Sequence, residues 1–173
     1  MKAVTIWRAG KRFPAPSRAR LRRMTAAAAE LAGLHDVSGG VCVSFLSPAG
    51  IERVNEDFLG HHGPTDVISF DYREEDDPGF NAETDVFDAA DDADPSIELI
   101  VCPAVAYEQA VKRGLPYAEE VALYVAHGLL HAAGYDDLNP KAKRVMRRAE
   151  KRVMAGLRKA GLIPPMEYKD FAE

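Results

Sequence analysis

Apolar positions along the chain follow two patterns: the three-to-four-residue period of amphipathic helices, and short β-branched runs. The helical pattern, bounded by capping residues and glycines, predicts helices over residues 17–33, 47–60, 103–112, 116–133 and 139–159. The β-branched runs predict strands at residues 4–7, 40–47, 67–72 and 98–102. About four strands and about five helices predict an α/β or α+β fold, in which a small mixed sheet packs against helices.

Three of the predicted helices carry an apolar stripe that should face the core. These stripes are Leu21, Met24, Ala28 and Leu31 on the first helix, Ile51, Val54 and Phe58 on the second, and Val145, Met146, Val153 and Leu157 on the last. The other side of the last helix is strongly basic. It carries Lys141, Lys143, Arg144, Arg147, Arg148, Lys151 and Arg152. These cations form either a solvated face or a nucleic-acid contact, and the sequence leaves both readings open.

The size and composition are those of a globular protein with one domain. With 173 residues, 47% hydrophobic and 28% charged, the chain is long enough to bury a core, so we expect a single domain over residues 1–173. No apolar run reaches the roughly 18 to 20 residues that span a bilayer, and no signal-peptide pattern is present. We therefore expect a cytoplasmic protein with no membrane partner. Cys42 and Cys102 lie in apolar runs and are expected to be buried free thiols.

Charge is unevenly distributed around the net value of −5. Residues 1–23 hold eight basic residues and no acid, whereas residues 71–98 hold twelve acids and a single base, Arg73. We interpret the segment at about 73–96 as an acidic insertion, without which the chain is net positive. A phosphate-binding surface needs cations that neighbouring acids do not neutralise, so the N-terminal segment predicts RNA contacts, with Arg18 and Arg22 as candidates.

Residues 126–137, AHGLLHAAGYDD, have the spacing of a metal site. His127 and His131 are four apart, so on a helix both imidazoles lie on one face and can reach one ion. Gly134 permits a left-handed turn that ends the helix and returns Asp137 toward that ion. Two nitrogens, one oxygen and an open position are typical of a catalytic zinc site. The alternative is a pair of satisfied core histidines without a metal.

The residue after the first histidine separates this pattern from that of zinc peptidases. Peptidases with an HExxH helix use the glutamate as a general base, and here that position is Gly128. Without this base, amide hydrolysis is disfavoured. A metal that lowers the pKa of water toward about 7 still permits hydrolysis of other bonds, of which RNA phosphodiesters are one class.

AHGLLHAAGYDD resembles the HGxLHLxGYDH signature of the YbeY family of metal-dependent endoribonucleases and rRNA maturation factors. Residues 55–72, NEDFLGHHGPTDVISFDY, are similar to the family segment N-x-x-[YF]-R-G-x-x-x-P-T-[DN]-V-L-S-F. Residues 97–102, IELIVC, resemble the family strand G-[DE]-I-x-I that follows. The three blocks occur in order between about Val41 and Gly161.

The resemblance implies a small α/β fold with the metal helix over a sheet, a cytoplasmic location and one zinc ion per chain. It implies action on single-stranded rRNA during small-subunit maturation, with ribosomal proteins or assembly factors as further partners. By position, it implies His127, His131 and Asp137 as the metal ligands. Zinc-bound water would act at phosphorus, and no catalytic side chain is assigned. Thr65, in the second block, is a further candidate for substrate binding.

The chain departs from the family pattern at three places. The third ligand is usually histidine and here is Asp137, with Asp136 beside it as a fallback ligand or supporting group. The family arginine between Phe58 and Gly60 is replaced by Leu59, which removes a cation suited to a phosphate. The acidic insertion is longer than the family requires.

These observations support three hypotheses. The first is a zinc-dependent, single-strand-specific endoribonuclease acting in rRNA processing and ribosome biogenesis. The second, suggested by Leu59, is a catalytically weak or inactive metal-binding factor for ribosome assembly. The third is a zinc metallopeptidase, which the histidine spacing alone supports and which the glycine at position 128 disfavours.

Overall fold

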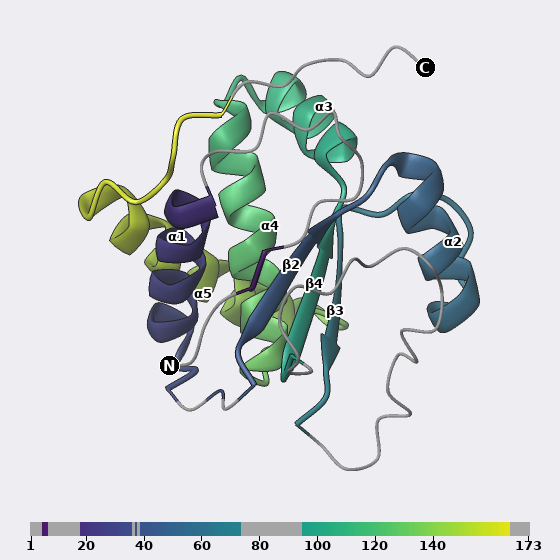
Figure 1. Ribbon diagram of the computed structural model, residues 1–173, viewed down its shortest axis with the longest axis horizontal. Helices are drawn as coiled ribbons and strands as arrows, with labels where there is room; N and C mark the ends of the chain where they lie inside the picture. The colour runs from purple at the N-terminus through teal and green to yellow at the C-terminus, as the bar shows by residue number, and fades with distance from the viewer. Residues whose placement is uncertain (1–4, 7–17, 36, 38, 74–94, 167–173) are drawn as a thin grey trace.

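A four-stranded mixed sheet lies at the centre of the computed structural model, which describes residues 5–6, 18–35, 37, 39–73 and 95–166. The strands stand in the spatial order β1 (Thr5–Ile6), β2 (Val41–Phe45), β4 (Ile97–Val101) and β3 (Val67–Asp71) (Figure 1). β1 and β4 each pair parallel with β2, whereas β3 is an antiparallel edge strand against β4. All residues of β2 and β4 are buried, as expected for strands rich in β-branched and aliphatic residues and covered on both faces.

Five helices accompany the sheet within the described residues. They are α1 (Arg18–Ala32), α2 (Pro48–Leu59), α3 (Pro103–Arg113), α4 (Tyr117–Ala132) and α5 (Pro140–Lys159). The ends follow local chemistry: Ser47 accepts a hydrogen bond from the Gly50 amide at the start of α2, and Asn139 accepts two at the start of α5. The predicted α+β class is confirmed, with bounds close to those expected from caps and glycines.

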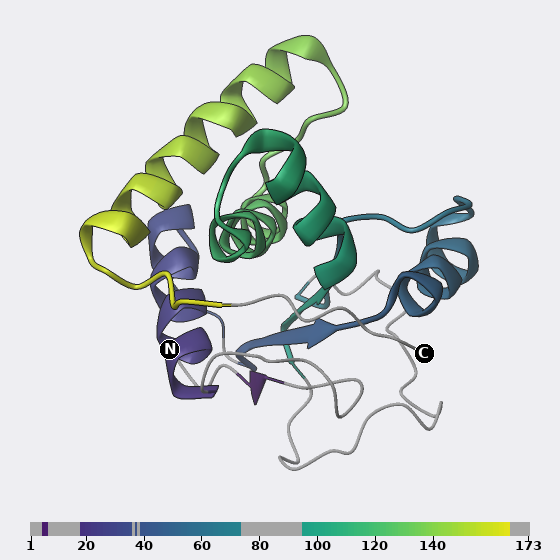
Figure 2. The ribbon, with the colours of Figure 1, turned by 90° about the horizontal axis from the view of Figure 1, so that it is seen from above.

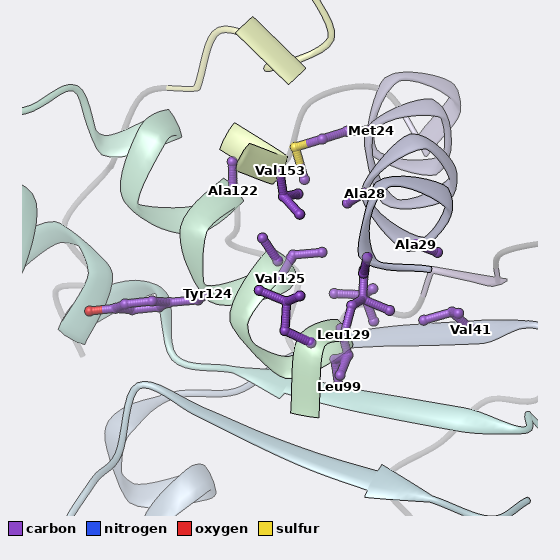
Figure 3. Packing of buried hydrophobic residues seen from close by; sticks show 14 of the residues in the cluster. Met24, Ala28, Ala29, Val41, Leu99, Ala122, Tyr124, Val125, Leu129 and Val153 are labelled. Atoms are coloured by element: carbon purple, nitrogen blue, oxygen red, sulfur yellow. The ribbon is translucent and has the colours of Figure 1, made fainter. Parts of the chain in front are cut away.

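The core lies between α4, the sheet and two covering helices. Viewed from above, α4 is seen nearly end-on with α1 on one side, α3 on the other, α5 across it and the sheet beneath (Figure 2). Leu129 and Val125 of α4 lie near Leu99 of β4, while Met24 of α1 lies near Val153 of α5 (Figure 3). α4 is therefore covered along most of its surface, and what remains accessible on it is a narrow face.

Three residues expected to face the core are partly exposed instead: Leu31 is 36% exposed, Val145 46% and Phe58 48%. The inward stripe of α5 begins at Met146 and continues through Val153 and Leu157, and Val145 is rotated about 100° from Met146. Phe58 lies in the last turn of α2, where its ring packs edge-on against Phe70 at a centroid distance of 5.6 Å. Cys42 and Cys102 are buried free thiols, as predicted.

Two sequence features lie partly outside the described residues. The acidic insertion lies outside them over residues 74–94, and so do four of the eight N-terminal cations, Lys2, Arg8, Lys11 and Arg12. In the part of the chain that the structure describes, no helix combines the length and hydropathy needed to traverse a bilayer.

Candidate metal centre and the groove beside it

α4 places two imidazoles one turn apart on its accessible face. The Nε2 atoms of His127 and His131 are 3.0 Å apart, and their rings stand nearly perpendicular. Their side chains are 21% and 34% exposed. The two Nε2 atoms therefore point at one small space that solvent reaches.

The chain turns back toward the histidines immediately after α4. Gly134 has a φ of 87°, which favours glycine, and the amide of Tyr135 donates to the carbonyl of Leu130. Asp137 follows, with its Oδ1 3.9 Å from His131 Nε2. One ligand atom from each of His127, His131 and Asp137 lies within 4.8 Å of the other two. The structure thus brings together three groups that could hold a metal ion.

The outer nitrogen of each imidazole is held by an oxygen. His127 Nδ1 lies 2.7 Å from a carboxylate oxygen of Glu150 on α5, and His131 Nδ1 lies 3.1 Å from the carbonyl oxygen of Tyr135. A carbonyl only accepts, so Nδ1 of His131 donates and its Nε2 carries a lone pair. Supporting oxygens of this kind fix the tautomer and orientation of metal-binding histidines.

The donor set fits a metal ion between the two Nε2 atoms. With both Nδ1 atoms donating outward from neutral rings, two lone pairs would face each other at 3.0 Å, a contact that either a proton on one ring or a metal ion between the two rings relieves. Two nitrogens each about 2.0 to 2.1 Å from a tetrahedral zinc lie roughly 3.3 to 3.4 Å apart, somewhat more than the spacing here. Burial disfavours a charged ring at His127, but the hydrogen bond and charge of Glu150 outweigh it and raise the pKa of His127. The hydrogen bond to His127 lowers the pKa of Glu150.

The structure explains why position 128 carries no base. A Cβ atom on Gly128 would lie 2.7 Å from Cδ2 of Leu99, which is fully buried in β4, and 3.5 Å from Val67. The Gly128 carbonyl accepts a hydrogen bond from the Ser69 hydroxyl of β3. A side chain at this position would therefore point into the sheet and away from the imidazoles.

A groove of about 690 Å³ begins at this centre and runs between α4 and α5. α4 and α5 are antiparallel there, since Glu119 pairs with Arg158 while His127 pairs with Glu150. The groove is lined by Asp66, Arg113, Leu115, Glu119, Glu120, Leu123, Tyr124, His127, Asp137, Lys143, Met146, Arg147, Glu150, Lys151, Met154 and Arg158. Tyr124 belongs to the buried core cluster, and its ring extends away from the other labelled members (Figure 3).

The other candidate residues lie at differing places. Thr65 is half-buried and donates to Asp66, a groove residue, over 3.1 Å. Arg18 and Arg22 are exposed on α1, and neither lines the groove. Leu59, the last residue of α2, is 48% exposed and does not line it either. Asp136 is exposed and accepts from the Leu138 amide.

Sequence reasoning did not identify Glu150. It lies 23 residues from His127, so no local spacing connects them. A signal was nevertheless present, because Glu150 is the single acid in the twenty residues of α5. An isolated acid on a basic helix, placed next to its buried stripe, is a candidate partner for a histidine elsewhere.

Comparison with known proteins gives a consistent result. The family model described as Endoribonuclease YbeY matches residues 13–158. A protein named Endoribonuclease YbeY from Alkalilimnicola ehrlichii is 34% identical over 155 residues, covering 89% of this chain and 83% of that protein. Another of that name, from Rhodopirellula baltica, is 34% identical over 154 residues, covering 87% and 68%. The solution structure of TM1509 from Thermotoga maritima is similar at a TM-score of 0.53 and 25% identity, over 98% of this chain and 99% of that one.

Proposed function

Because this chain belongs to the YbeY family, we propose that it is a zinc-dependent endoribonuclease that cuts single-stranded RNA during small-subunit rRNA maturation and ribosome biogenesis. The observation that carries the proposal is the pair of Nε2 atoms 3.0 Å apart beside a carboxylate, with the outer nitrogens held by oxygens. The relatives are named as endoribonucleases, which supports the reaction class.

His127 and His131 would hold the metal through Nε2, and Asp137 through a carboxylate oxygen. When bound, a zinc ion supplies a Lewis acid that activates water near neutral pH and stabilises charge on phosphoryl oxygens. The chain's own contribution is to hold the ligands: Glu150 orients His127, and the Tyr135 carbonyl orients His131. With three protein ligands, the metal would keep a coordination position for water or substrate.

The remaining roles follow from the same proposal. Arg18, Arg22 and Thr65 would contact the RNA. The protein would act in the cytoplasm, on the small-subunit rRNA precursor, together with ribosomal proteins or assembly factors. Position 128 supports a nuclease over a metallopeptidase, since the buried backbone there has no room for the glutamate that a peptidase needs.

Metal analysis tests the centre directly. Protein purified without chelator should contain about one equivalent of zinc, and His127→Ala should lose it, because removal of one of three ligands costs most of the affinity. A single-stranded rRNA fragment should be cut by the wild type and not by the variant or after chelation. Purified wild-type protein free of any transition metal would contradict the proposed centre, and loaded protein that leaves RNA intact would contradict the proposed activity.

A second candidate is a ribosome-assembly factor that binds metal and RNA without turnover. Leu59 favours it, because an exposed apolar side chain occupies the position where the family pattern has an arginine. Leu59→Arg distinguishes the two. Cleavage gained only by this variant would support the assembly factor, whereas cleavage by the wild type excludes it.

A further inference from the structure

Three cations of α5 line the groove, and none of them forms a salt bridge with a described residue. These are Lys143, Arg147 and Lys151, which are exposed. They are spaced four apart, so they lie in a row on one face of the helix, about 6 Å from one to the next. The row lines the same groove as Asp137, and Glu150 lies within its span, between Arg147 and Lys151 in the sequence.

The acids of the groove are already engaged by other groups. Glu119 pairs with Arg158 and Glu120 with Arg113, each at 2.7 Å. Glu150 is hydrogen-bonded to His127, and Asp137 belongs to the metal group. Asp66 accepts from the Val67 amide and the Thr65 hydroxyl. None of these acids forms a salt bridge with the α5 row, although the charge of Arg147 contributes to lowering the pKa of Glu150.

Apolar side chains of α4 and α5 also line the groove. They are Leu123 and Tyr124 of α4 and Met146 and Met154 of α5. Leu123 is partly exposed, whereas Tyr124, Met146 and Met154 are almost fully buried and form the floor of the groove. A positively charged groove that follows the backbone is the electrostatic part of single-strand binding, with phosphates on the cations. At about 690 Å³ the groove has the size of a small-ligand site, which is room for a few nucleotides.

We propose that Lys143, Arg147 and Lys151 form a phosphate track that leads a single RNA strand along α5 to the metal centre. This rests on the proposed function and adds where the strand lies. Arg147 is one helical turn from Glu150, the residue that orients His127, so it is the member of the row suited to the phosphate next to the cut. These cations of α5 line the groove that begins at the metal centre, whereas Leu59 does not line it.

The chain offers a matched control on the same helix. Arg147→Ala/Lys151→Ala removes two groove cations, whereas Arg144→Ala/Arg148→Ala removes two exposed cations with the same spacing that do not line the groove. Both variants change net charge equally. Matching thermal unfolding curves establish that both are folded. Binding of a fluorescently labelled, short 2′-O-methyl RNA strand to zinc-loaded protein is then measured by anisotropy over a range of salt concentrations.

The groove variant should bind about tenfold more weakly and lower the log–log salt slope by roughly 1.4, the value for two lost phosphate contacts to a single strand. The control variant should stay within about twofold of wild type. Equal losses in the two variants, or no loss in either, would overturn the track. So would displacement of the strand by a polyglutamate peptide or an RNA duplex as effectively as by unlabelled strand.

Cleavage measured in parallel separates this proposal from the one on which it rests. If the wild type binds the strand through the groove cations and fails to cut RNA, the phosphate track is supported and the proposed nuclease activity is contradicted. If the wild type cuts RNA and the groove variant binds and cuts equally well, the nuclease activity is supported and the phosphate track is contradicted.

Discussion

α4 and α5 lie antiparallel against each other, yet they contribute to the molecule in opposite ways. α4 is buried along most of its length and exposes a narrow face with the two histidines. α5 buries one stripe and exposes a wide basic face. The buried helix holds the two histidines rigidly, and the exposed helix can change its charged residues at little cost to the core. Under the proposed function, α4 would position the metal and α5 would supply the charge that binds RNA.

A glycine in each helix makes the comparison quantitative. An added Cβ on Gly128 of α4 and on Gly156 of α5 would each lie 2.7 Å from a leucine methyl group. Leu99, facing Gly128, is fully buried, whereas Leu31, facing Gly156, is 36% exposed at the end of a flexible side chain. The same distance therefore means a rigid contact in one helix and an adjustable one in the other.

The largest expected effect is on stability. Gly128→Ala should lower the free energy of unfolding by up to about 2 kcal/mol, because overpacking against Leu99, at about 1 to 3 kcal/mol, exceeds the roughly 1 kcal/mol that alanine adds in a helix. Gly156→Ala should remain within about 1 kcal/mol of wild type, since Leu31 can turn toward solvent. Urea unfolding of both variants in chelator measures this. Equal losses would show that α5 is as tightly packed at its glycine as α4.

The next effect is on zinc affinity and concerns Glu150, the acid of α5 that is hydrogen-bonded to His127 of α4. Glu150→Gln keeps an acceptor near His127 and removes the charge, so zinc affinity should fall about 10- to 100-fold, the usual cost of losing a supporting partner. Competition with a chromophoric chelator measures affinity. Glu30→Gln, an exposed glutamate on α1, is the control and should bind zinc as wild type does. If neither Glu150→Gln nor Glu150→Ala changes the zinc affinity, the orientation of the His127 imidazole does not depend on Glu150.

The smallest effect is a pH dependence carried by the buried end of α4. Glu120 is fully buried, and this burial raises its pKa more than the charge of Arg113 lowers it. The folded state therefore binds the proton more tightly, so this group favours folding at low pH and loses that contribution as pH rises from about 4.5. Relative to Glu120→Gln, wild type should lose stability across this window, by less than about 1 kcal/mol, since Arg113 is half exposed. Unfolding at several pH values checks it, and parallel curves would contradict it.

Much of this organisation was predictable from the sequence because local rules decided it. The caps Ser47 and Asn139 marked the helix starts. The four-residue spacing of His127 and His131 needed only helical geometry to bring two nitrogens together, and the Gly134 turn did the rest. The geometry at these residues depends on contacts within about ten positions of the chain.

What could not be predicted depends on how elements dock. Val145 and Met146 are equally apolar, and only the rotation of α5 against α1 and α4 determines which one is buried. The same rotation directs Lys143, Arg147 and Lys151 into the groove and Arg144 and Arg148 away from it. The contact of Glu150 with His127 likewise follows from the antiparallel docking of α5 on α4. Composition alone left these cations indistinguishable.

The turn after α4 is held in place by contacts of Tyr135 and not by Asp137, the residue that follows the turn. The Tyr135 amide donates to Leu130, its carbonyl accepts from His131, and its hydroxyl accepts from Arg152 on α5. The backbone at position 137 therefore arrives at the same place whichever side chain it carries. A single-base change in a codon converts aspartate to histidine, so the anchored turn makes the proposed third ligand exchangeable by one mutation without rebuilding the loop.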